Sequence, residues 1–200
     1  MLIAGLTGGM GCGKSFVAKA LRDLGCSVIE ADEVGHEVLL PGGEAFEAVV
    51  AAFGKSILNA EGLIDRAALA AKVFENPSEL QRLNAIVHPA VRRTSLRRMH
   101  DIGERDPHAL IIYVAAILLE SGAYRDVQKI ILVTCTREQQ LARSLKRPGA
   151  TEATVKARLD RQMPPDEKKP FADYLLDASG TEAETLQQTR AIWENLKLQA

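Results

Sequence analysis

Residues 8–15 read Gly-Gly-Met-Gly-Cys-Gly-Lys-Ser and fit the spacing G-x-x-x-x-G-K-[ST] of a phosphate-binding loop. Glycines let successive backbone N–H groups point toward an anion, and the N-terminus of a following helix adds partial positive charge. Lys14 would then reach the β- and γ-phosphates of a nucleotide, and the Ser15 hydroxyl would ligate Mg²⁺. The residues expected to bind ATP are Gly9, Met10, Gly11, Cys12, Gly13, Lys14, Ser15 and Phe16.

Asp32 is the first candidate for a group that acts on a phosphate acceptor. Residues 27–32 predict a buried strand with Asp32 just past its carboxyl end, where open parallel sheets bind their ligands. Its carboxylate would face the acceptor hydroxyl or the metal. A second interpretation makes Asp32 the N-cap of a helix that begins near Glu33. Both can hold, because capping uses only part of the acceptor capacity of a carboxylate.

Three further side chains could contact substrate, and each has a structural alternative. His88 could bind substrate or serve only the packing of its helix. Arg92 is one of four arginines between positions 92 and 98, which could grip an anionic substrate or form a solvated helix face. Glu120 follows the third predicted strand and could contact metal or substrate, or be a favourable acid in the first turn of a helix.

The stretch 143–169 has the character of a mobile lid. It carries eight basic residues and three prolines, with helical periodicity but few bulky apolar side chains. Arginines in such a lid can neutralise charge as a phosphoryl group is transferred, and Arg143 and Arg147 are the candidates. The alternative is a helical hairpin that is merely solvated.

These residues need a scaffold, and the sequence predicts an α/β protein with a doubly wound, five-stranded parallel sheet of the P-loop NTPase type. Apolar runs at 2–6, 27–32, 109–114, 129–134 and 173–177 predict the strands. Residues 36–98 show helical periodicity without a strand, broken at 76–78 and again at the His88-Pro89 pair. We therefore expect a nucleotide-binding core at 1–35, 99–142 and 170–200, a helical substrate-binding subdomain at 36–98, and the lid at 143–169.

Composition excludes several other classes of protein. The net charge of −1 argues against binding to nucleic acid or to a membrane surface, and only 4% of residues are aromatic, too few for an obvious base-stacking platform. Residues 2–6 are too short for a signal peptide, and the longest apolar run, 109–119, is too short to span a bilayer. Three scattered cysteines favour a cytoplasmic protein with reduced thiols.

Five separated blocks, in order, resemble the dephospho-CoA kinase family. The first is the family's L-T-G-G-[IM]-G-[SC]-G-K-S, and the second is L-G-x-x-V-I-[DE]-A-D. The third, L-N-x-I-x-H-P-x-[VI]-R, belongs to the family's substrate domain, the fourth to its lid, and the fifth is similar to A-D-Y followed by two hydrophobic residues and D-x-S-G. The blocks lie at residues 6–15, 24–32, 83–92, 140–164 and 172–180.

The resemblance implies phosphorylation of the ribose 3′-hydroxyl of dephospho-CoA by ATP, with Mg²⁺ as cofactor. Asp32 matches the family's catalytic acid, and Lys14 and Ser15 match its phosphate and Mg²⁺ residues. Arg143 and Arg147 fall in its lid segment, whereas His88 and Arg92 fall in its CoA-domain motif. We expect a monomer or a weak homo-oligomer.

Three positions depart from the family pattern. Phe16 stands where a threonine commonly follows the loop serine, which removes a hydroxyl near the α-phosphate but leaves the metal ligand. Pro148 stands where an aspartate often follows the lid arginine. Ala116 replaces the proline of a P-L-L-F-E pattern that ends at Glu120.

Two other functions share part of this pattern. A nucleoside or nucleotide monophosphate kinase has the same loop, helical insertion and lid, and differs in the acceptor that it turns over. A GTP-dependent switch has the loop, but this sequence has no N-K-x-D motif for guanine and no D-x-x-G after the third strand.

Overall fold

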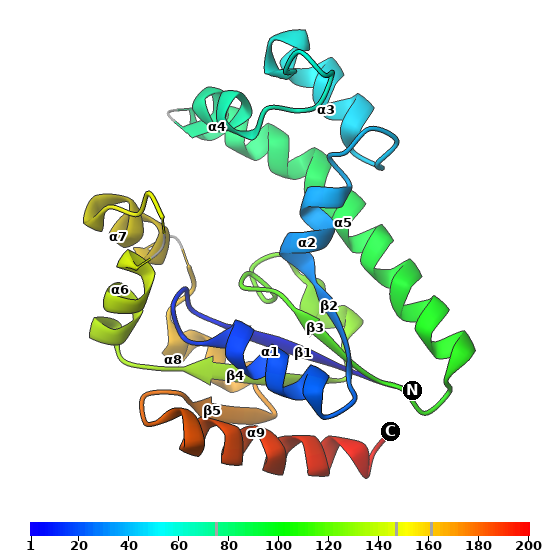
Figure 1. The fold of residues 1–200 in the computed structure, drawn as a ribbon, viewed down its shortest axis with the longest axis vertical. Helices are drawn as coiled ribbons and strands as arrows, with labels where there is room; N and C mark the ends of the chain where they lie inside the picture. Colours follow the sequence, from blue (N-terminus) through cyan, green and yellow to red (C-terminus); the bar gives the residue numbers. More distant parts are fainter. Residues whose placement is uncertain (75, 147, 161) are drawn as a thin grey trace. The chain divides into compact units, whose positions relative to one another are not determined.

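A computed structural model of the chain describes residues 1–74, 76–146, 148–160 and 162–200. The chain forms two compact units, one made of Met1–Glu30 and Met99–Ala200, the other of Ala31–Arg98 (Figure 1). The first unit contains the β-sheet and the phosphate loop. The second is built mainly from helices.

The sheet has five parallel strands in the order β2-β3-β1-β4-β5, which confirms the expected P-loop type of α/β fold. Strand β1 lies at the centre, and its seven residues are all buried because neighbouring strands and helices cover it. The loop that follows it therefore starts from the buried centre of the sheet. The strands are β1 (Leu2–Gly8), β2 (Ser27–Glu30), β3 (Leu110–Val114), β4 (Lys129–Thr134) and β5 (Tyr174–Asp177).

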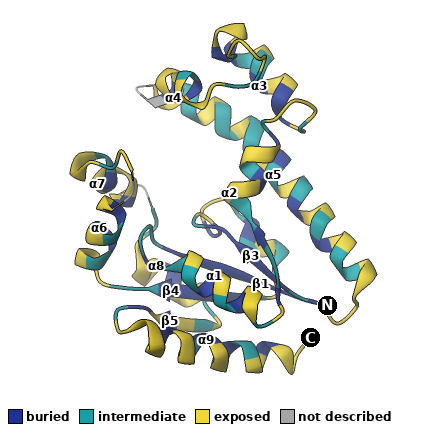
Figure 2. Cartoon of the chain, viewed as in Figure 1, coloured by how far each residue is buried: buried dark blue, intermediate teal, exposed yellow. Residues whose placement is uncertain are grey.

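Two helices, α1 (Lys14–Asp23) and α9 (Glu182–Lys197), pack together against one face of the sheet. Val17 and Leu21 of α1 and Leu196 of α9 are buried against alternate residues of the central strands. Figure 2 shows the strands largely buried and the outer sides of these helices exposed. This amphipathic packing fixes where α1, and hence the end of the phosphate loop, begins.

The rest of the first unit contains α6 (Arg137–Leu145), α7 (Glu152–Asp160) and α8 (Pro165–Lys168), with short 3-10 helices η2 (Ala123–Asp126) and η3 (Lys169–Phe171). Helix α6 begins with a capping box in which the Thr136 hydroxyl accepts from the Gln139 N–H and the Gln139 side chain accepts from the Thr136 N–H. Helices α6 and α7 contact each other, and the predicted lid includes the end of α6 and all of α7 and α8.

The second unit contains α2 (Ala31–Glu37), α3 (Phe46–Phe53), 3-10 helix η1 (Lys55–Ile57), α4 (Arg66–Phe74) and most of α5 (Pro77–Arg105). Asp65 accepts hydrogen bonds from the N–H groups of Ala67 and Ala68, which is how α4 begins. None of the helices in the described part of the chain combines the length and apolar character needed to cross a membrane.

The expectation that the helix would break at the His88-Pro89 pair is wrong, since α5 runs through Pro89 without interruption. A proline inside a helix costs about 3 kcal/mol, so contacts elsewhere must compensate. On one side of it, Arg82 of α5 lies over the Phe53 ring, and on the other Arg93 pairs with Glu44. Packing on both sides of the proline keeps the two halves in one helix.

Candidate active site

The phosphate loop joins the end of β1 to the start of α1, and two of its glycines adopt conformations that other residues rarely reach. Gly11 has a φ of +78° and Gly13 a φ of +92°, both in the left-handed region. Gly13 is the N-cap of α1, so the N-terminus of this helix, with its partial positive charge, lies at the end of the loop. Such an arrangement is suited to binding an anion.

Two of the loop glycines are also needed because α6 approaches closely. A Cβ on Gly9 would lie 2.2 Å from Nε2 of Gln140, and a Cβ on Gly11 would lie 2.6 Å from the Gln140 carbonyl oxygen. Gln140 is buried and donates from Nε2 to Sγ of Cys12 at 3.0 Å. The loop is thus packed against α6 as well as attached to the sheet.

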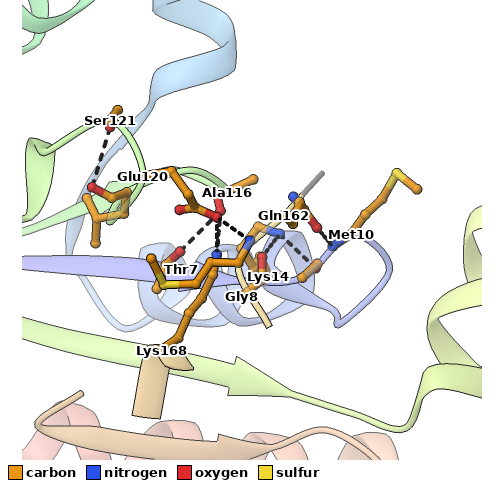
Figure 3. Close-up of polar contacts among 12 residues, drawn as sticks. Thr7, Gly8, Met10, Lys14, Ala116, Glu120, Ser121, Gln162 and Lys168 are labelled. Carbon is orange, nitrogen blue, oxygen red and sulfur yellow. Dashed lines mark hydrogen bonds and ion pairs between the residues drawn. The ribbon is translucent and has the colours of Figure 1, made fainter. Parts of the chain in front are cut away.

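Lys14 lies across the loop with its ammonium against backbone oxygens. Its Nζ donates to the carbonyl oxygens of Gly8 at 2.8 Å and of Gly9 at 3.0 Å (Figure 3). These carbonyl oxygens are neutral acceptors, and phosphate oxygens bind a cation more strongly, so Lys14 can exchange them for the phosphates of a nucleotide.

Ser15 and Phe16 are the second and third residues of α1, and the Ser15 side chain is exposed at the mouth of the loop. A hydroxyl oxygen is a hard ligand of the kind Mg²⁺ accepts. In the part of the chain that the structure describes, no three His, Cys, Asp or Glu side chains gather to hold a metal ion. A site with one protein oxygen fits Mg²⁺ that is carried mainly by nucleotide phosphates.

Asp32 belongs to the helical unit, where it is exposed and is the second residue of α2. The structure differs from the proposed N-cap, because α2 already begins at Ala31 and Asp32 lies within its first turn. An acidic side chain is favourable in the first turn of a helix, whose N-terminus carries partial positive charge.

His88 and Arg92 lie one turn apart on α5 and are both exposed. Partial desolvation lowers the pKa of His88, which favours the neutral imidazole. Three neighbouring arginines are paired with acids of the same unit: Arg93 and Arg97 with Glu44, and Arg98 with Glu37. These pairs support the interpretation of a solvated face for three of the four arginines.

Glu120 lies beyond β3, with its side chain 22% exposed. Its Oε1 accepts from Nζ of Lys168 at 2.9 Å and from the backbone N–H of Met163 at 3.1 Å (Figure 3). The carboxylate therefore holds protein groups at the end of the lid. Contact with metal or substrate through its remaining acceptor capacity stays a prediction.

The structure describes one of the two predicted lid arginines. Arg143, on α6, donates from Nη2 to the carbonyl oxygen of Ala178 at 3.0 Å, which holds it beside the turn that follows β5. Its other guanidinium N–H groups could serve a nucleotide. Arg147 lies outside the described residues.

The Cys12 side chain points into the protein and not toward a nucleotide. It is 1% exposed, and its Sγ lies 3.3 Å from Sγ of Cys135, the residue after β4. Burial raises the pKa of the Cys135 thiol to about 12, and its contact with Cys12 acts in the same direction. Cys12 can contribute to nucleotide binding through its backbone.

Three side chains at this site escaped sequence reasoning: Gln140, Gln162 and Lys168. They border a cavity of about 330 Å³ beside Gly9. Gln162 stands in a segment that resembles the kinase family, but neither its type nor its spacing indicates a partner in the phosphate loop. Lys168 falls in the stretch predicted to form a mobile lid, yet only 1% of its side chain is exposed. Only a tertiary contact could reveal these roles.

Comparison with known proteins gives the same family over nearly the whole chain. The sequence model of the dephospho-CoA kinase family matches residues 2–184. The dephospho-CoA kinase of Geobacter metallireducens is 44% identical over 194 residues, which are 97% of this chain and 96% of that protein.

Two solved structures are similar over nearly their full length. A crystal structure from Thermus thermophilus has a TM-score of 0.81 and 31% identity, covering 98% of this chain and 97% of the other. The dephospho-CoA kinase from Campylobacter jejuni has a TM-score of 0.74 and 27% identity, with coverage of 98% and 96%.

Proposed function

The chain belongs to the dephospho-CoA kinase family, and on that premise we propose how its residues carry out phosphoryl transfer. The protein is an ATP-dependent kinase whose substrates are ATP and dephospho-CoA. The match over residues 2–184 carries this assignment and favours it over a nucleoside or nucleotide monophosphate kinase. The acceptor that we propose is the ribose 3′-hydroxyl.

The phosphate loop would bind ATP through the backbone N–H groups at the start of α1 and through Lys14. The ammonium would leave the Gly8 and Gly9 carbonyl oxygens, to which it now donates, and move onto the β- and γ-phosphates. Phosphoryl transfer depends on alignment and charge neutralisation, and both would be supplied here. Mg²⁺, held by the Ser15 hydroxyl and the phosphates, would neutralise further charge on the triphosphate.

Asp32 would orient the acceptor hydroxyl and receive its proton late in the transfer. This role is supported by its exposed carboxylate in the first turn of α2, where the helix terminus stabilises negative charge. His88 and Arg92, exposed on one face of α5, would contact the dephospho-CoA. Glu120 would contribute to the same substrate site.

Arg143 and Arg147 would close over the γ-phosphate and exclude water, which limits hydrolysis of ATP. Arg143 can do so with the guanidinium N–H groups that the Ala178 carbonyl leaves available. We also propose that the protein is cytoplasmic and works as a monomer or weak homo-oligomer without nucleic-acid or membrane partners. Its three free cysteines support the location, and gel filtration tests the oligomeric state.

One assay tests the proposed acceptor. ADP release is measured with dephospho-CoA, AMP, CMP, adenosine and pantothenate, and the product of dephospho-CoA is checked for a 3′-phosphate. We expect turnover with dephospho-CoA and with none of the other acceptors. Lys14→Ala should lose most of this turnover and stay folded, because a loop lysine adds little to the core. Faster turnover of AMP or CMP would refute the assignment.

A further inference from the structure

The segment that returns from the lid to the sheet, residues 162–168, contacts the phosphate loop directly. Oε1 of Gln162 accepts from the backbone N–H of Met10 at 2.8 Å. Figure 3 shows this contact beside Lys14, at the end of β1. The two residues are 152 positions apart, so the contact exists only in the folded chain.

The same loop peptide is held on its other side. The carbonyl of the Gly9–Met10 peptide accepts from Nζ of Lys14 at 3.0 Å and from the Cys12 N–H at 3.2 Å. Its N–H is the group that donates to Gln162. The Gly9–Met10 peptide is therefore hydrogen-bonded through both its carbonyl and its N–H, and Lys14 is one of its partners.

The residue after Gln162 is held by an ion pair between Lys168, which is buried, and Glu120. Lys168 is 1% exposed, and its Nζ donates to the Ala116 carbonyl oxygen at 3.1 Å and to Glu120 at 2.9 Å. Glu120 also accepts from the N–H of Met163, the residue after Gln162. Because a buried ammonium without partners is costly, this arrangement has one strongly preferred geometry.

The hydrogen bond between Met10 and Gln162 matters because Lys14 would move when ATP binds. When the ammonium moves to the phosphates, the Gly9 carbonyl loses the hydrogen bond from Lys14. Glycine has few steric restraints, so the Gly9–Met10 peptide could then rotate and disturb the N–H groups around it. Preorganised N–H groups are what give a phosphate loop its effect on the transition state.

We propose that Gln162 is a positioning residue that holds the Gly9–Met10 peptide of the phosphate loop in place while Lys14 engages ATP, and that the Lys168–Glu120 pair positions Gln162. The inference rests on the proposed function, since it assigns this contact a part in ATP use. The end of the lid would thus hold the phosphate loop in place, in addition to the closing movement proposed for the lid arginines.

The kinetic test uses Gln162→Leu, which keeps similar bulk and removes the acceptor. Its matched control is Gln187→Leu, at an exposed position on α9. We expect kcat/KM for ATP to fall about tenfold, or about 1.4 kcal/mol, while KM for dephospho-CoA and the melting temperature stay within error of wild type. The control should behave as wild type.

A second measurement reads the contact itself without using activity. The chain has four methionines, and labelling them with ¹⁵N places signals on the donors Met10 and Met163 and on Met99, which is buried in α5. In Gln162→Leu, solvent exchange of the Met10 amide should accelerate at least tenfold, with Met99 unchanged. In Lys168→Met, both Met163 and Met10 should exchange faster. Gln162→Glu keeps an acceptor at the same reach and should restore protection of Met10.

The outcomes separate this inference from the function on which it rests. Wild-type kinetics for ATP in Gln162→Leu, or unchanged exchange of the Met10 amide, would overturn the positioning role and leave the kinase assignment intact. If KM for dephospho-CoA rises while kcat/KM for ATP holds, Gln162 belongs to the acceptor site and the inference is wrong. Absence of turnover in the wild type would count against the function alone. Should Gln162→Leu not fold, Gln162→Ala takes its place in both measurements.

Discussion

Replacing Asp32 by asparagine separates a catalytic carboxylate from one that only stabilises its helix. The side chain is exposed in the first turn of α2, so it contributes little to packing. An acid at this place interacts with the helix N-terminus by about 0.3–1 kcal/mol. Asparagine keeps the shape and one acceptor oxygen, so the loss of folding free energy should lie at the low end of that range.

The catalytic cost should be much larger. Loss of a general base lowers a rate by about 10²–10⁴-fold, which at about 1.36 kcal/mol per decade is roughly 3–5 kcal/mol. We therefore expect Asp32→Asn to lower kcat for dephospho-CoA at least about a hundredfold, with nearly unchanged ATP affinity and melting temperature.

Glu33→Gln is the matched control, because Glu33 is a second exposed acid in the same helical turn. Glu33→Gln should lose the same small favourable interaction with the helix N-terminus and keep the kcat of the wild type. The measurements are ADP release at saturating substrates, calorimetric binding of ATP, and thermal unfolding of both variants. A sharp drop in melting temperature with kcat per folded molecule unchanged would refute the catalytic role, and Glu120 would be the next residue to test.

Three further outcomes are expected. Gly11→Ala should weaken ATP binding at least about tenfold in a calorimetric titration, because its Cβ would lie 2.6 Å from the Gln140 carbonyl oxygen in a strained backbone. The control is Gly149→Ala, which is also at positive φ but has nothing within 4 Å of its Cβ, and it should bind ATP normally. Desolvation lowers the pKa of His88 in the folded protein below the unfolded value of 6.5. The contribution of His88 to folding stability is therefore complete above pH 6.5, and it is lost as the pH falls through the lower pKa of the folded state. His88→Gln should thus show a smaller drop in melting temperature between about pH 7 and pH 5, and an equal drop would contradict the desolvation. The raised pKa of Cys135, about 12, predicts slow alkylation of the native thiol at neutral pH, and mass spectrometry should show rapid labelling only after unfolding.

Local pattern in the sequence was enough for the fold and for the phosphate loop. Each parallel strand is a run of apolar residues, and β4 lies at the predicted residues 129–134. The loop follows from the spacing of glycines and a lysine between a strand and a helix, all within eight residues. Such features depend on neighbours in the chain, so the sequence states them directly.

Tertiary structure decided the features that depend on distant partners. Pro89 carries a strong local signal for a break, but packing of α5 on both sides of it outweighs that signal. Likewise, the Glu120 side chain allowed several roles until Lys168 and the Met163 N–H were found beside it.

The contact between Gln162 and Met10 shows the same limit most clearly. A glutamine amide can donate or accept with almost any polar group, so its residue type does not specify a partner. Burial of Lys168 against Glu120 and the course of the chain back to β5 bring that amide to the loop. The chemistry of the loop was therefore encoded locally, whereas the support that keeps the loop in shape arises only when the lid end folds against it.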